Sequence, residues 1–511
     1  MGPRYPASGT DLTERQHDGS SAMKRAAASG APTMRAADQA QTWFDAVNTL
    51  SDFGVNVTAL AVILGVPLFG LAAWIGWRRP AFIFVPALAS LALRPELLWG
   101  DSNIGYEWGL HQTLLVIALL INALRFGLRK SINWPIVALI VVFGLNLLFG
   151  NLHRDLTIGL MLTSLSLLML PFAFTHVILA PDSRRVCTLV IVFTPLLSVA
   201  IGALLQVAGI HTTFRSVYDR LEGATGNAGV FGLLAFAGFA VALHESTAGP
   251  QARPWVVALA CVNLTLVILS GTRMSILASA VLLLAYLLTS EQFRELLRQN
   301  RAFFFFGICL IGGSLTLYAP TLYRRLFAGL GRSETWERFY DEFWRSPIFG
   351  RGIGSGFIAL NPLELIFAAP HNEYLHLLVV GGVLGFILCI AGIVLWYLDL
   401  VRTVSLHDRE FLLAVAPALA IYAMTDNILV YPTTLALYAY LGVISQSTAL
   451  NSSIAIAENG AQELRTGVTT HAEVQGISLR QGDGTFARLG CLTQDALEAC
   501  LARLTSRRER S

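Results

Sequence analysis

Long apolar runs separated by short polar loops recur from about residue 51 to residue 450. Crossing the hydrocarbon core of a bilayer takes about 20 helical residues, and most of these runs approach or reach that length. We therefore predict an all-α fold, a polytopic transmembrane helical bundle with about 12–13 spans. The expected spans are 55–76, 81–98, 111–125, 134–150, 156–180, 186–209, 228–246, 254–270, 274–290, 302–319, 374–398, 411–426 and 428–448.

Two polar segments flank the predicted transmembrane domain of residues 51–450. Residues 1–50 are rich in Ala, Ser, Gly and charged side chains, so we expect them to be disordered, and residues 451–511 are expected to form a polar cytoplasmic tail. With 54% hydrophobic residues, 14% charged residues and a mean hydropathy of +0.59, the chain has too little polar surface for a water-soluble protein of this length. The lipid bilayer is thus the expected partner, and the net charge of +3 gives no reason to expect nucleic acid.

Basic residues distinguish alternate loops, and short cytoplasmic loops gather Lys and Arg. The loops marked in this way carry Arg125, Arg129 and Lys130; Arg184 and Arg185; Arg253; Arg294, Arg298 and Arg301; and Arg402 and Arg409. The intervening loops then face the opposite side, in particular the long loop 320–373 and the turn at Asp426 and Asn427. Arg78 and Arg79 mark the first short loop as cytoplasmic too, which leaves the orientation of the N-terminal segment open.

The long loop contains one predicted amphipathic helix with an aromatic face. Ser333 can cap its start, and Ser346-Pro347 ends it. One interpretation is a helix that lies in the outer membrane interface, where Trp and Tyr are favoured. The other is a lid over a lipid-lined cavity. The aromatic residues are Trp336, Phe339, Tyr340, Phe343 and Trp344, at i, i+3, i+4, i+7 and i+8.

A histidine stands where the long loop ends and an apolar helix begins. His371 and Asn372 open this segment, and few other polar groups lie at the predicted membrane boundaries. A histidine that is mostly neutral at pH 7 can accept a proton in a transition state. His376 lies five residues further on, about 140° around a helix, which suits a shared metal poorly. With no DxD or HExxH motif present, we predict no metal site and no cofactor.

Arginines at the predicted outer boundaries are candidates for binding phosphate. A guanidinium group stays charged and offers a planar fork of donors, and helix N-termini add backbone N–H groups. Arg220, with Arg215 nearby, precedes a glycine-rich helix start, and Arg273 opens another helix. For any single arginine, an anchor that snorkels to lipid headgroups is an alternative. Arg332, Arg338 and Arg351 are second-rank candidates, and Arg338 can instead pair with Glu334.

The order of these motifs resembles the bacterial O-antigen ligase and Wzy-type polymerase superfamily over roughly residues 186–448. The residues that carry the resemblance are Arg220 to Asn227, Leu269-Ser-Gly-Thr-Arg273, Pro347-Ile-Phe-Gly350-Arg-Gly352-Ile-Gly354-Ser-Gly356-Phe357, His371-Asn-Glu-Tyr-Leu375, Gly382-Val-Leu-Gly385 and Asp426-Asn427 to Pro432.

This resemblance implies a metal-independent, inverting glycosyltransferase of the bacterial inner membrane whose site faces the periplasm. It implies a glycan on undecaprenyl diphosphate as donor, and lipid A-core or a second lipid-linked repeat as acceptor, in O-antigen or exopolysaccharide assembly. Carried over by position, His371 takes the proton from the acceptor hydroxyl, and Arg220 and Arg273 hold the leaving diphosphate. Arg215, Arg332, Arg338, Arg351 and Asn372 are further candidates for substrate contact. Other proteins of polysaccharide assembly are possible partners.

Two alternatives remain at this stage. A transporter or flippase for lipid-linked glycans could also line a cavity with arginines, although such proteins commonly show internal repeats or discontinuous helices, and no repeat is evident here. A protein-glycosylating oligosaccharyltransferase of the same superfamily usually adds an extracytoplasmic C-terminal domain, whereas this tail is short and polar. The sequence does not separate ligase from polymerase.

Overall fold

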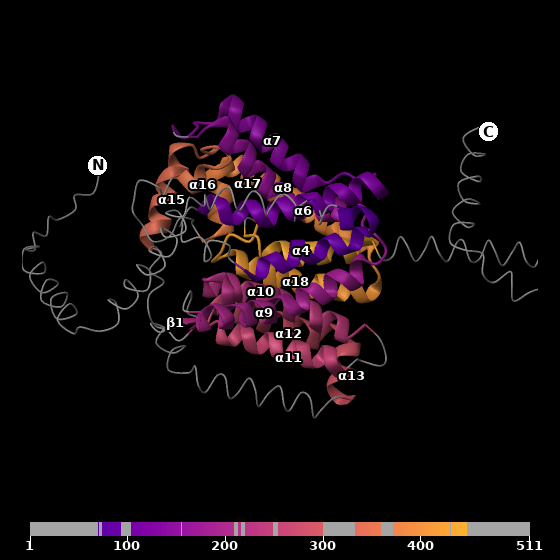
Figure 1. Ribbon diagram of the computed structural model, residues 1–511. Coiled ribbons are helices and arrows are strands. Elements are labelled where there is room, and N and C mark those ends of the chain that lie inside the picture. The colour runs from indigo at the N-terminus through magenta and orange to yellow at the C-terminus, as the bar shows by residue number, and fades with distance from the viewer. Residues whose placement is uncertain are drawn as a thin grey trace, which may run out of the picture. The chain divides into compact units, whose positions relative to one another are not determined.

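The structure is a computed structural model that describes residues 70, 74–93, 104–154, 156–208, 213–215, 220–248, 254–299, 333–358, 371–429 and 431–446 (Figure 1). The chain divides into two compact units, Met1–Thr448 and Ala449–Ser511, and all described residues belong to the first. The polar segments predicted at 1–50 and 451–511 lie outside the described residues.

The described part of the chain is almost entirely helical. Its elements are η1 (Pro80–Ile83), α4 (Phe84–Ala89), η2 (Ser90–Ala92), α6 (Ile104–Phe126), α7 (Trp134–Phe149), α8 (Ile158–His176), α9 (Ser183–Val207), β1 (Phe214–Arg215), β2 (Arg220–Leu221), η3 (Gly223–Thr225), α10 (Ala228–Ser246), α11 (Pro254–Leu269), α12 (Arg273–Thr289), α13 (Glu291–Gln299), α15 (Ser333–Arg345), α16 (Ser355–Ile358), α17 (Glu373–Thr403) and α18 (Leu406–Ala423). A last helix covers Thr434–Gln446.

The predicted all-α bundle is confirmed, and helices lie in the predicted spans that the structure describes, with ends that differ by up to seven residues, as at the start of α6. Of the predicted spans, 302–319 lies outside the described residues, as does most of 55–76. Four described helices, α8, α9, α10 and α17, are long and apolar enough to cross a membrane, and α12 with α13, bent by 98°, makes a fifth if the pair is one span. The other apolar helices are shorter, so the count of 12–13 spans stays a prediction.

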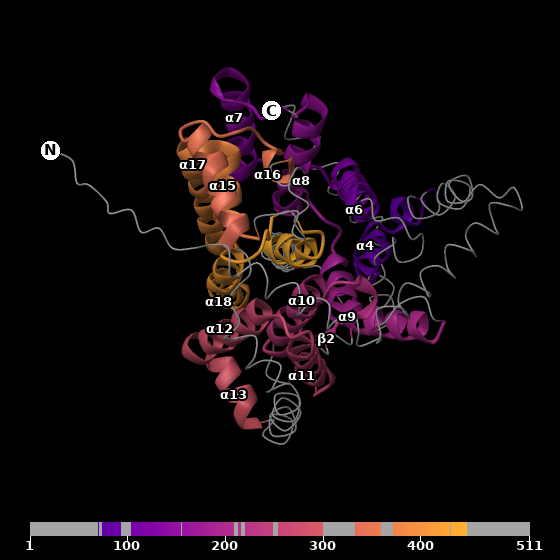
Figure 2. The same ribbon diagram turned by 90° about the vertical axis from the view of Figure 1, so that its left-hand side faces the viewer.

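Helix α10 lies in the interior of the described bundle. It contacts α9, α11 and α12, and 83% of its apolar window is buried, against 39–44% in the other three single-helix spans (Figure 2). Its sequence is apolar on every side, which is typical of a helix enclosed by others. Glycines allow this enclosure, because a Cβ at Gly238 would meet Asn263 Oδ1 at 2.7 Å and one at Gly232 would meet Ser270 Oγ at 2.7 Å.

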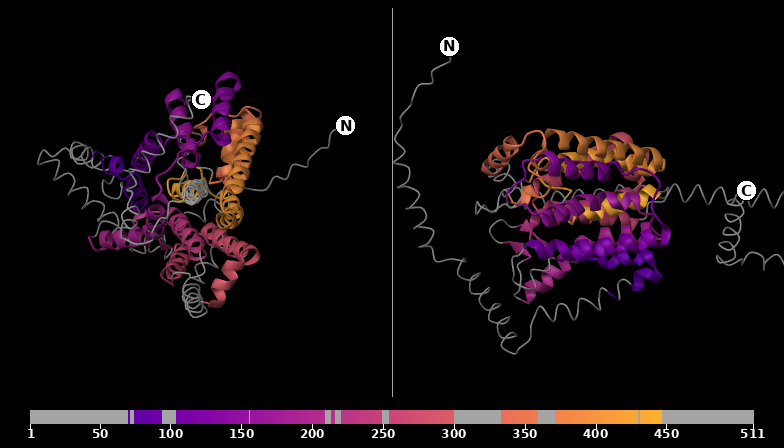
Figure 3. Two further views of the ribbon diagram at one scale, coloured as in Figure 1. Left: turned by 90° about the vertical axis from the view of Figure 1, so that its right-hand side faces the viewer. Right: turned by 90° about the horizontal axis from the view of Figure 1, so that it is seen from above.

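Loop contacts fall into two groups at opposite ends of the helices, which run side by side (Figure 3, right). At one end, which we name the His371 end, residue 153 binds residue 351, Arg220 binds residues 270–272, and His371 binds Asp426. At the other, the Arg184 end, Arg184 binds Glu245 and Asp408, and Arg129 binds residue 445. These two groups match the alternation that the basic residues predict.

Helix α17 is broken at Gly382, whose φ of 63° and ψ of −170° are not helical. The segment 347–352 replaces the missing helical bonds: Val383 N–H donates to Pro347 O at 2.8 Å and Leu384 N–H to Ile348 O at 3.2 Å. In return, Val379 O accepts from Arg351 N–H at 2.8 Å and Val380 O from Gly352 N–H at 3.1 Å. Backbone groups away from water must be paired, so this segment is part of the helix's own bonding.

Asn146 of α7 fixes the same junction from the other side. Its side chain is fully buried and donates to Phe349 O at 2.6 Å and Val380 O at 3.2 Å, while its Oδ1 accepts from Ile353 N–H at 3.1 Å. Gly350, Gly352 and Gly354 all have positive φ, and a Cβ at Gly350 would collide with Val380 O. The glycine-rich segment 350–356 therefore turns tightly, and it packs onto the break in α17.

We predict that Asn146→Leu destabilises the protein by on the order of 3 kcal/mol, because it leaves Phe349 O and Ile353 N–H without their partner in the core and removes one of the two donors to Val380 O. The measurement is the thermal unfolding of purified protein in detergent. Asn151→Leu is the matched control, since Asn151 is exposed and its side chain makes one bond, to Arg345 O. Equal melting temperatures for the two variants would contradict this account of the junction.

Candidate active site

His371 lies directly before α17 in a left-handed backbone conformation, with φ 48°, the one positive φ of a non-glycine residue in the described chain. Its Nδ1 lies 3.1 Å from Asp426 Oδ1, and the Tyr431 hydroxyl lies 3.4 Å from the same nitrogen. His371 and Asp426 keep side-chain exposures of 18% and 15%, so both can be reached from solvent. Such a conformation persists where the surrounding structure holds it, and it makes His371 a candidate functional residue.

Neighbouring residues hold this pair in place. Asn372 caps α17, since its Oδ1 accepts from Leu375 N–H at 3.1 Å, and its backbone N–H donates to Asn427 Oδ1 at 3.1 Å. Asn427 N–H in turn donates to Asp426 Oδ1 at 3.0 Å. Asn372 is a sequence candidate for sugar contact. Its side-chain oxygen binds the backbone of α17 as a helix cap.

The bond to Asp426 determines what the imidazole can do. When Nδ1–H donates to the carboxylate, the neutral ring carries its basic lone pair on Nε2. The carboxylate also stabilises the imidazolium that forms if Nε2 takes up a proton. The arrangement is therefore that of a general base with its orienting partner.

Arg220 binds the turn that precedes α12. Its Nε donates to Ser270 O at 2.9 Å, and its second terminal nitrogen contacts Gly271 O at 3.3 Å and Thr272 Oγ1 at 3.2 Å. Arg215 pairs with Arg220 across the two-stranded β1–β2 ladder, and its side chain lies outside the described side chains.

Arg273 is the first residue of α12 and is half-buried. The start of α12 lies beside the start of α10, because the Thr272 hydroxyl donates to Ala228 O at 2.8 Å. Asn227 caps α10, and its Oδ1 accepts from Gly229 N–H at 2.8 Å. Two helix N-termini and the turn held by Arg220 thus place positive charge and positive dipole ends in one region.

The last turns of α18 connect the arginine region with His371. Ser275, two residues after Arg273, lies 3.2 Å from the Tyr422 hydroxyl, and Tyr374 donates to Ala420 O at 2.9 Å. Asp426 follows Tyr422 by four residues. The structure therefore brings His371, Arg220 and Arg273 to the same end of the helices. There, α18 contacts both α12, which begins with Arg273, and α17, which follows His371.

The second-rank arginines Arg351, Arg338 and Arg332 differ in their surroundings. Arg351 is 7% exposed and is bound by Glu342 Oε2 at 3.0 Å and Asn151 O at 2.7 Å, so its guanidinium group joins α15 to the end of α7. Arg338 is exposed on α15, and its predicted partner Glu334 lies outside the described side chains. Arg332 lies outside the described residues.

The aromatic face of α15 divides in two. Trp336, Phe339 and Phe343 pack against Leu375 and Val379 of α17, next to His371. The other two aromatic residues, Tyr340 and Trp344, are 51% and 69% exposed. The helix therefore covers the first turns of α17 with one part of its face and presents the other part outward.

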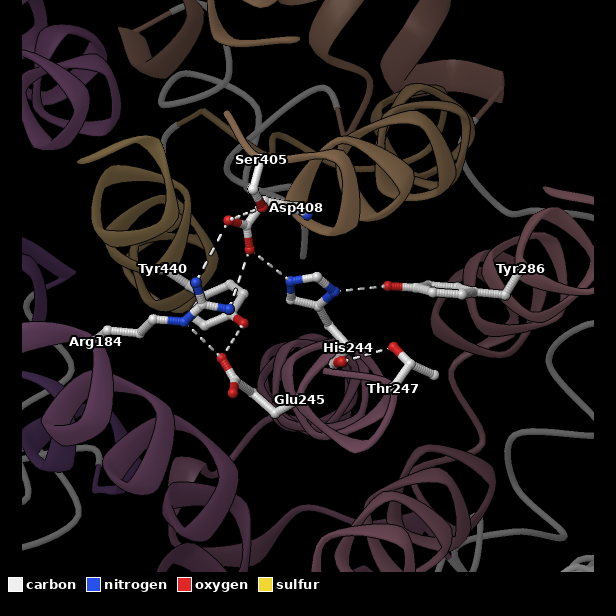
Figure 4. A network of polar contacts seen from close by, with 8 residues as sticks. All are labelled: Arg184, His244, Glu245, Thr247, Tyr286, Ser405, Asp408 and Tyr440. Atoms are coloured by element: carbon white, nitrogen blue, oxygen red, sulfur yellow. Dashed lines mark hydrogen bonds and ion pairs between the residues drawn. The ribbon is translucent and has the colours of Figure 1, made fainter. Parts of the chain in front are cut away.

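A second polar cluster lies at the Arg184 end (Figure 4). Arg184 of α9 contacts Glu245 at 3.1 Å and Asp408 at 3.0 Å. His244 joins Asp408 Oδ1 at 3.0 Å to the Tyr286 hydroxyl at 3.1 Å. Ser405 and Tyr440 complete the cluster, with bonds of 2.7 Å to Asp408 and Glu245.

This cluster ties together α9, α10, α12, α18 and the helix Thr434–Gln446. His244 and Asp408 are 0% and 1% exposed, so substrate cannot reach the imidazole without a rearrangement of the helices. We interpret the cluster as a structural ion network. Within the residues that the structure describes, no three His, Cys, Asp or Glu side chains converge in a way that could hold a metal ion.

Sequence reasoning missed the partner of His371. Asp426 was placed only in an outer turn, and it lies 55 positions from His371. No local sequence pattern links the two residues. Both lie in predicted outer loops, so the sequence indicated only that they face the same side of the membrane.

Comparison with known proteins agrees with the sequence resemblance. Residues 256–390 match the family described as O-antigen ligase, a region that begins in α11 and ends within α17. It contains Arg273 and His371, whereas Arg220 and Asp426 lie outside it. A search of curated proteins finds no match. The chain is thus a multi-pass membrane protein with an O-antigen ligase family region.

Removal of the arginine of the second cluster should cost stability. We predict that Arg184→Met lowers the free energy of unfolding by about 3 kcal/mol, because it leaves two carboxylates without their cation. Arg185→Met is the matched control, since Arg185 is adjacent and exposed. Unfolding of both proteins in detergent gives the comparison, and a loss of equal size in the control would show that the network adds nothing.

Proposed function

We propose that this chain transfers a glycan from undecaprenyl diphosphate to a saccharide acceptor at the periplasmic face of the bacterial inner membrane, in O-antigen or exopolysaccharide assembly. The observation that carries the proposal is the His371–Asp426 contact of 3.1 Å at the end of the bundle that also holds Arg220 and Arg273. The match of residues 256–390 to the O-antigen ligase family supports glycan transfer as the reaction class.

In the proposed reaction, His371 acts as general base. Its Nε2 takes the proton of the acceptor hydroxyl while that oxygen attacks the anomeric carbon of the donor. A sugar hydroxyl is far too weak an acid to ionise beforehand, so proton transfer accompanies bond formation. Attack from the face opposite the diphosphate inverts the anomeric centre. Asp426 orients the ring and stabilises the imidazolium.

The bond that breaks joins the anomeric carbon to a diphosphate oxygen, and negative charge grows on that oxygen. Arg273, at the N-terminus of α12, and Arg220, which holds the turn before it, are the proposed donors to the leaving group. The scheme needs no metal, because these guanidinium groups supply the positive charge that a divalent cation supplies in other transferases.

The acceptor is lipid A-core if the chain is a ligase, or another lipid-linked repeat if it is a polymerase. Both reactions use the same base and the same diphosphate site. The transporter alternative gains little from the break in α17, because segment 347–352 already binds the peptide groups on both sides of Gly382. The break therefore offers no open helix ends to a substrate.

We predict that His371→Ala abolishes transfer while the protein is still inserted in the membrane. Cells should then keep single lipid-linked repeats and lose long chains if the chain is a polymerase. They should accumulate long lipid-linked chains above bare lipid A-core if it is a ligase. Sizing of lipid-linked and finished surface glycans is the measurement, and wild-type profiles in both would rule out His371 as the base.

Arg273→Lys and Arg273→Ala test the diphosphate site. A lysine keeps the charge but loses the planar fork, so we expect a rate between those of wild type and alanine, with alanine slower by about 10²- to 10³-fold. Arg402→Ala is the matched control because Arg402 is exposed in the last turn of α17, at the Arg184 end. Turnover of extracted lipid-linked glycan by purified variants is the measurement, and equal rates for Arg273→Ala and the control would contradict the assignment.

A further inference from the structure

A buried Glu–His pair lies at the first turn of α17, and the proposed reaction does not use it. Glu373 and His376 are 3% and 1% exposed, and His376 Nδ1 lies 2.9 Å from Glu373 Oε1. The second carboxylate oxygen accepts from Leu429 N–H at 3.0 Å. Burying a carboxylate is costly unless its oxygens are bound, so both contacts are needed to keep it there.

Glu373 is one of three successive residues that bind the segment 426–431. His371 binds Asp426, the N–H of Asn372 binds Asn427, and Glu373 binds Leu429. The first two contacts are partly exposed, whereas the third is buried. Water competes less with a buried bond to a charged group, so that bond is the strongest constraint on the register of the two segments.

The Glu373–His376 pair also contacts a third segment, α16. The His376 ring packs so closely on α16 that a Cβ at Gly356 would meet its Cδ2 at 2.6 Å and its Nε2 at 2.9 Å. The ring therefore has little room to turn, and its Nδ1 points to Glu373. The direction of the Glu373 carboxylate, and with it the position of Leu429, depends on this packing.

We propose that Glu373 and His376 are positioning residues that place Asp426 against His371. The carboxylate of Glu373 fixes the backbone at Leu429, three residues after Asp426, and so holds Asp426 Oδ1 at the Nδ1 of His371. Neither side chain touches substrate. This inference rests on the proposed function, since it concerns the rate of a step in which His371 is the base.

The expected effect of Glu373→Ala is a fall in turnover of on the order of 10- to 100-fold, the scale of losses when a supporting contact is removed or a reacting group moves by about 1 Å. The concentration of lipid-linked glycan that gives half-maximal rate should change by less than about threefold, because the diphosphate is held by Arg220 and Arg273. A loss of folded protein would lower the maximal rate in the same way, so each rate is divided by the amount of folded, monodisperse protein in the sample.

Conservative variants of Glu373 and His376 should keep most of the activity that Glu373→Ala loses. Glu373→Gln can accept from Leu429 N–H with its oxygen and donate to His376 Nδ1 if the ring adopts its other tautomer. His376→Gln can still donate to Glu373, whereas His376→Leu cannot. We expect both glutamine variants to be within about threefold of wild type, and His376→Leu to follow Glu373→Ala.

The decisive test is a double-mutant cycle with Asp426→Asn, measured as turnover of lipid-linked glycan extracted from cells that lack this protein. If Glu373 acts through Asp426, the variant carrying both Glu373→Ala and Asp426→Asn turns over at nearly the rate of Asp426→Asn alone. If the rate losses of the two single variants multiply in the double variant, the proposal is overturned. Glu337→Ala, an exposed glutamate on α15, is the matched control.

Gly356→Ala provides a milder route to the same disturbance if Glu373→Ala does not fold. It displaces the His376 ring and should give the same lowered turnover and the same non-additivity with Asp426→Asn. Wild-type turnover in Gly356→Ala and His376→Leu would overturn the positioning role while His371→Ala stays inactive. Activity in His371→Ala would instead refute the proposed function itself.

Discussion

The candidate site depends on one seam of hydrogen bonds between the start of α17 and the segment that follows α18. Residues 371–373 bind residues 426, 427 and 429, and the resulting contacts place a carboxylate at Nδ1 of His371. A histidine at the end of a loop has many accessible orientations, and the seam selects one of them. It also keeps His371 in a backbone conformation that a non-glycine residue adopts only under constraint.

The seam is stable because the surrounding helices satisfy their own backbone groups. The break in α17 at Gly382 would leave carbonyls and N–H groups unpaired within the apolar bundle, yet segment 347–352 and Asn146 bind them. Arg351, a candidate for substrate contact in the sequence, binds Glu342 and Asn151 O. At the opposite end, the network around Arg184 and Asp408 joins five helices. The polar groups of this protein thus serve two purposes: those around Asn146 and Arg184 support the fold, and those around His371 form the candidate site.

Hydrophobic runs predicted most of the fold, because α10, α11 and α12 begin and end within one residue of the expected spans. The basic residues predicted which loops meet, and His371 and Arg273 were found from their places at helix starts. Contacts between distant residues could not be predicted in this way. Asp426 and Arg351 are ordinary polar residues in the sequence, and only the folded chain reveals that one faces His371 and the other is buried against Glu342. The seam has no local signature, since its two sides are about 55 residues apart and nothing in either segment specifies the other.

The central claim is that the His371 end holds the donor diphosphate and the proton acceptor together. The most direct measurement is an experimental structure of the inactive His371→Ala protein with bound lipid-linked glycan. The account predicts diphosphate oxygens within hydrogen-bond distance of Arg273 or Arg220, with the anomeric carbon facing the position left by the imidazole. A diphosphate bound elsewhere, or one whose anomeric carbon faces away from residue 371, would contradict it.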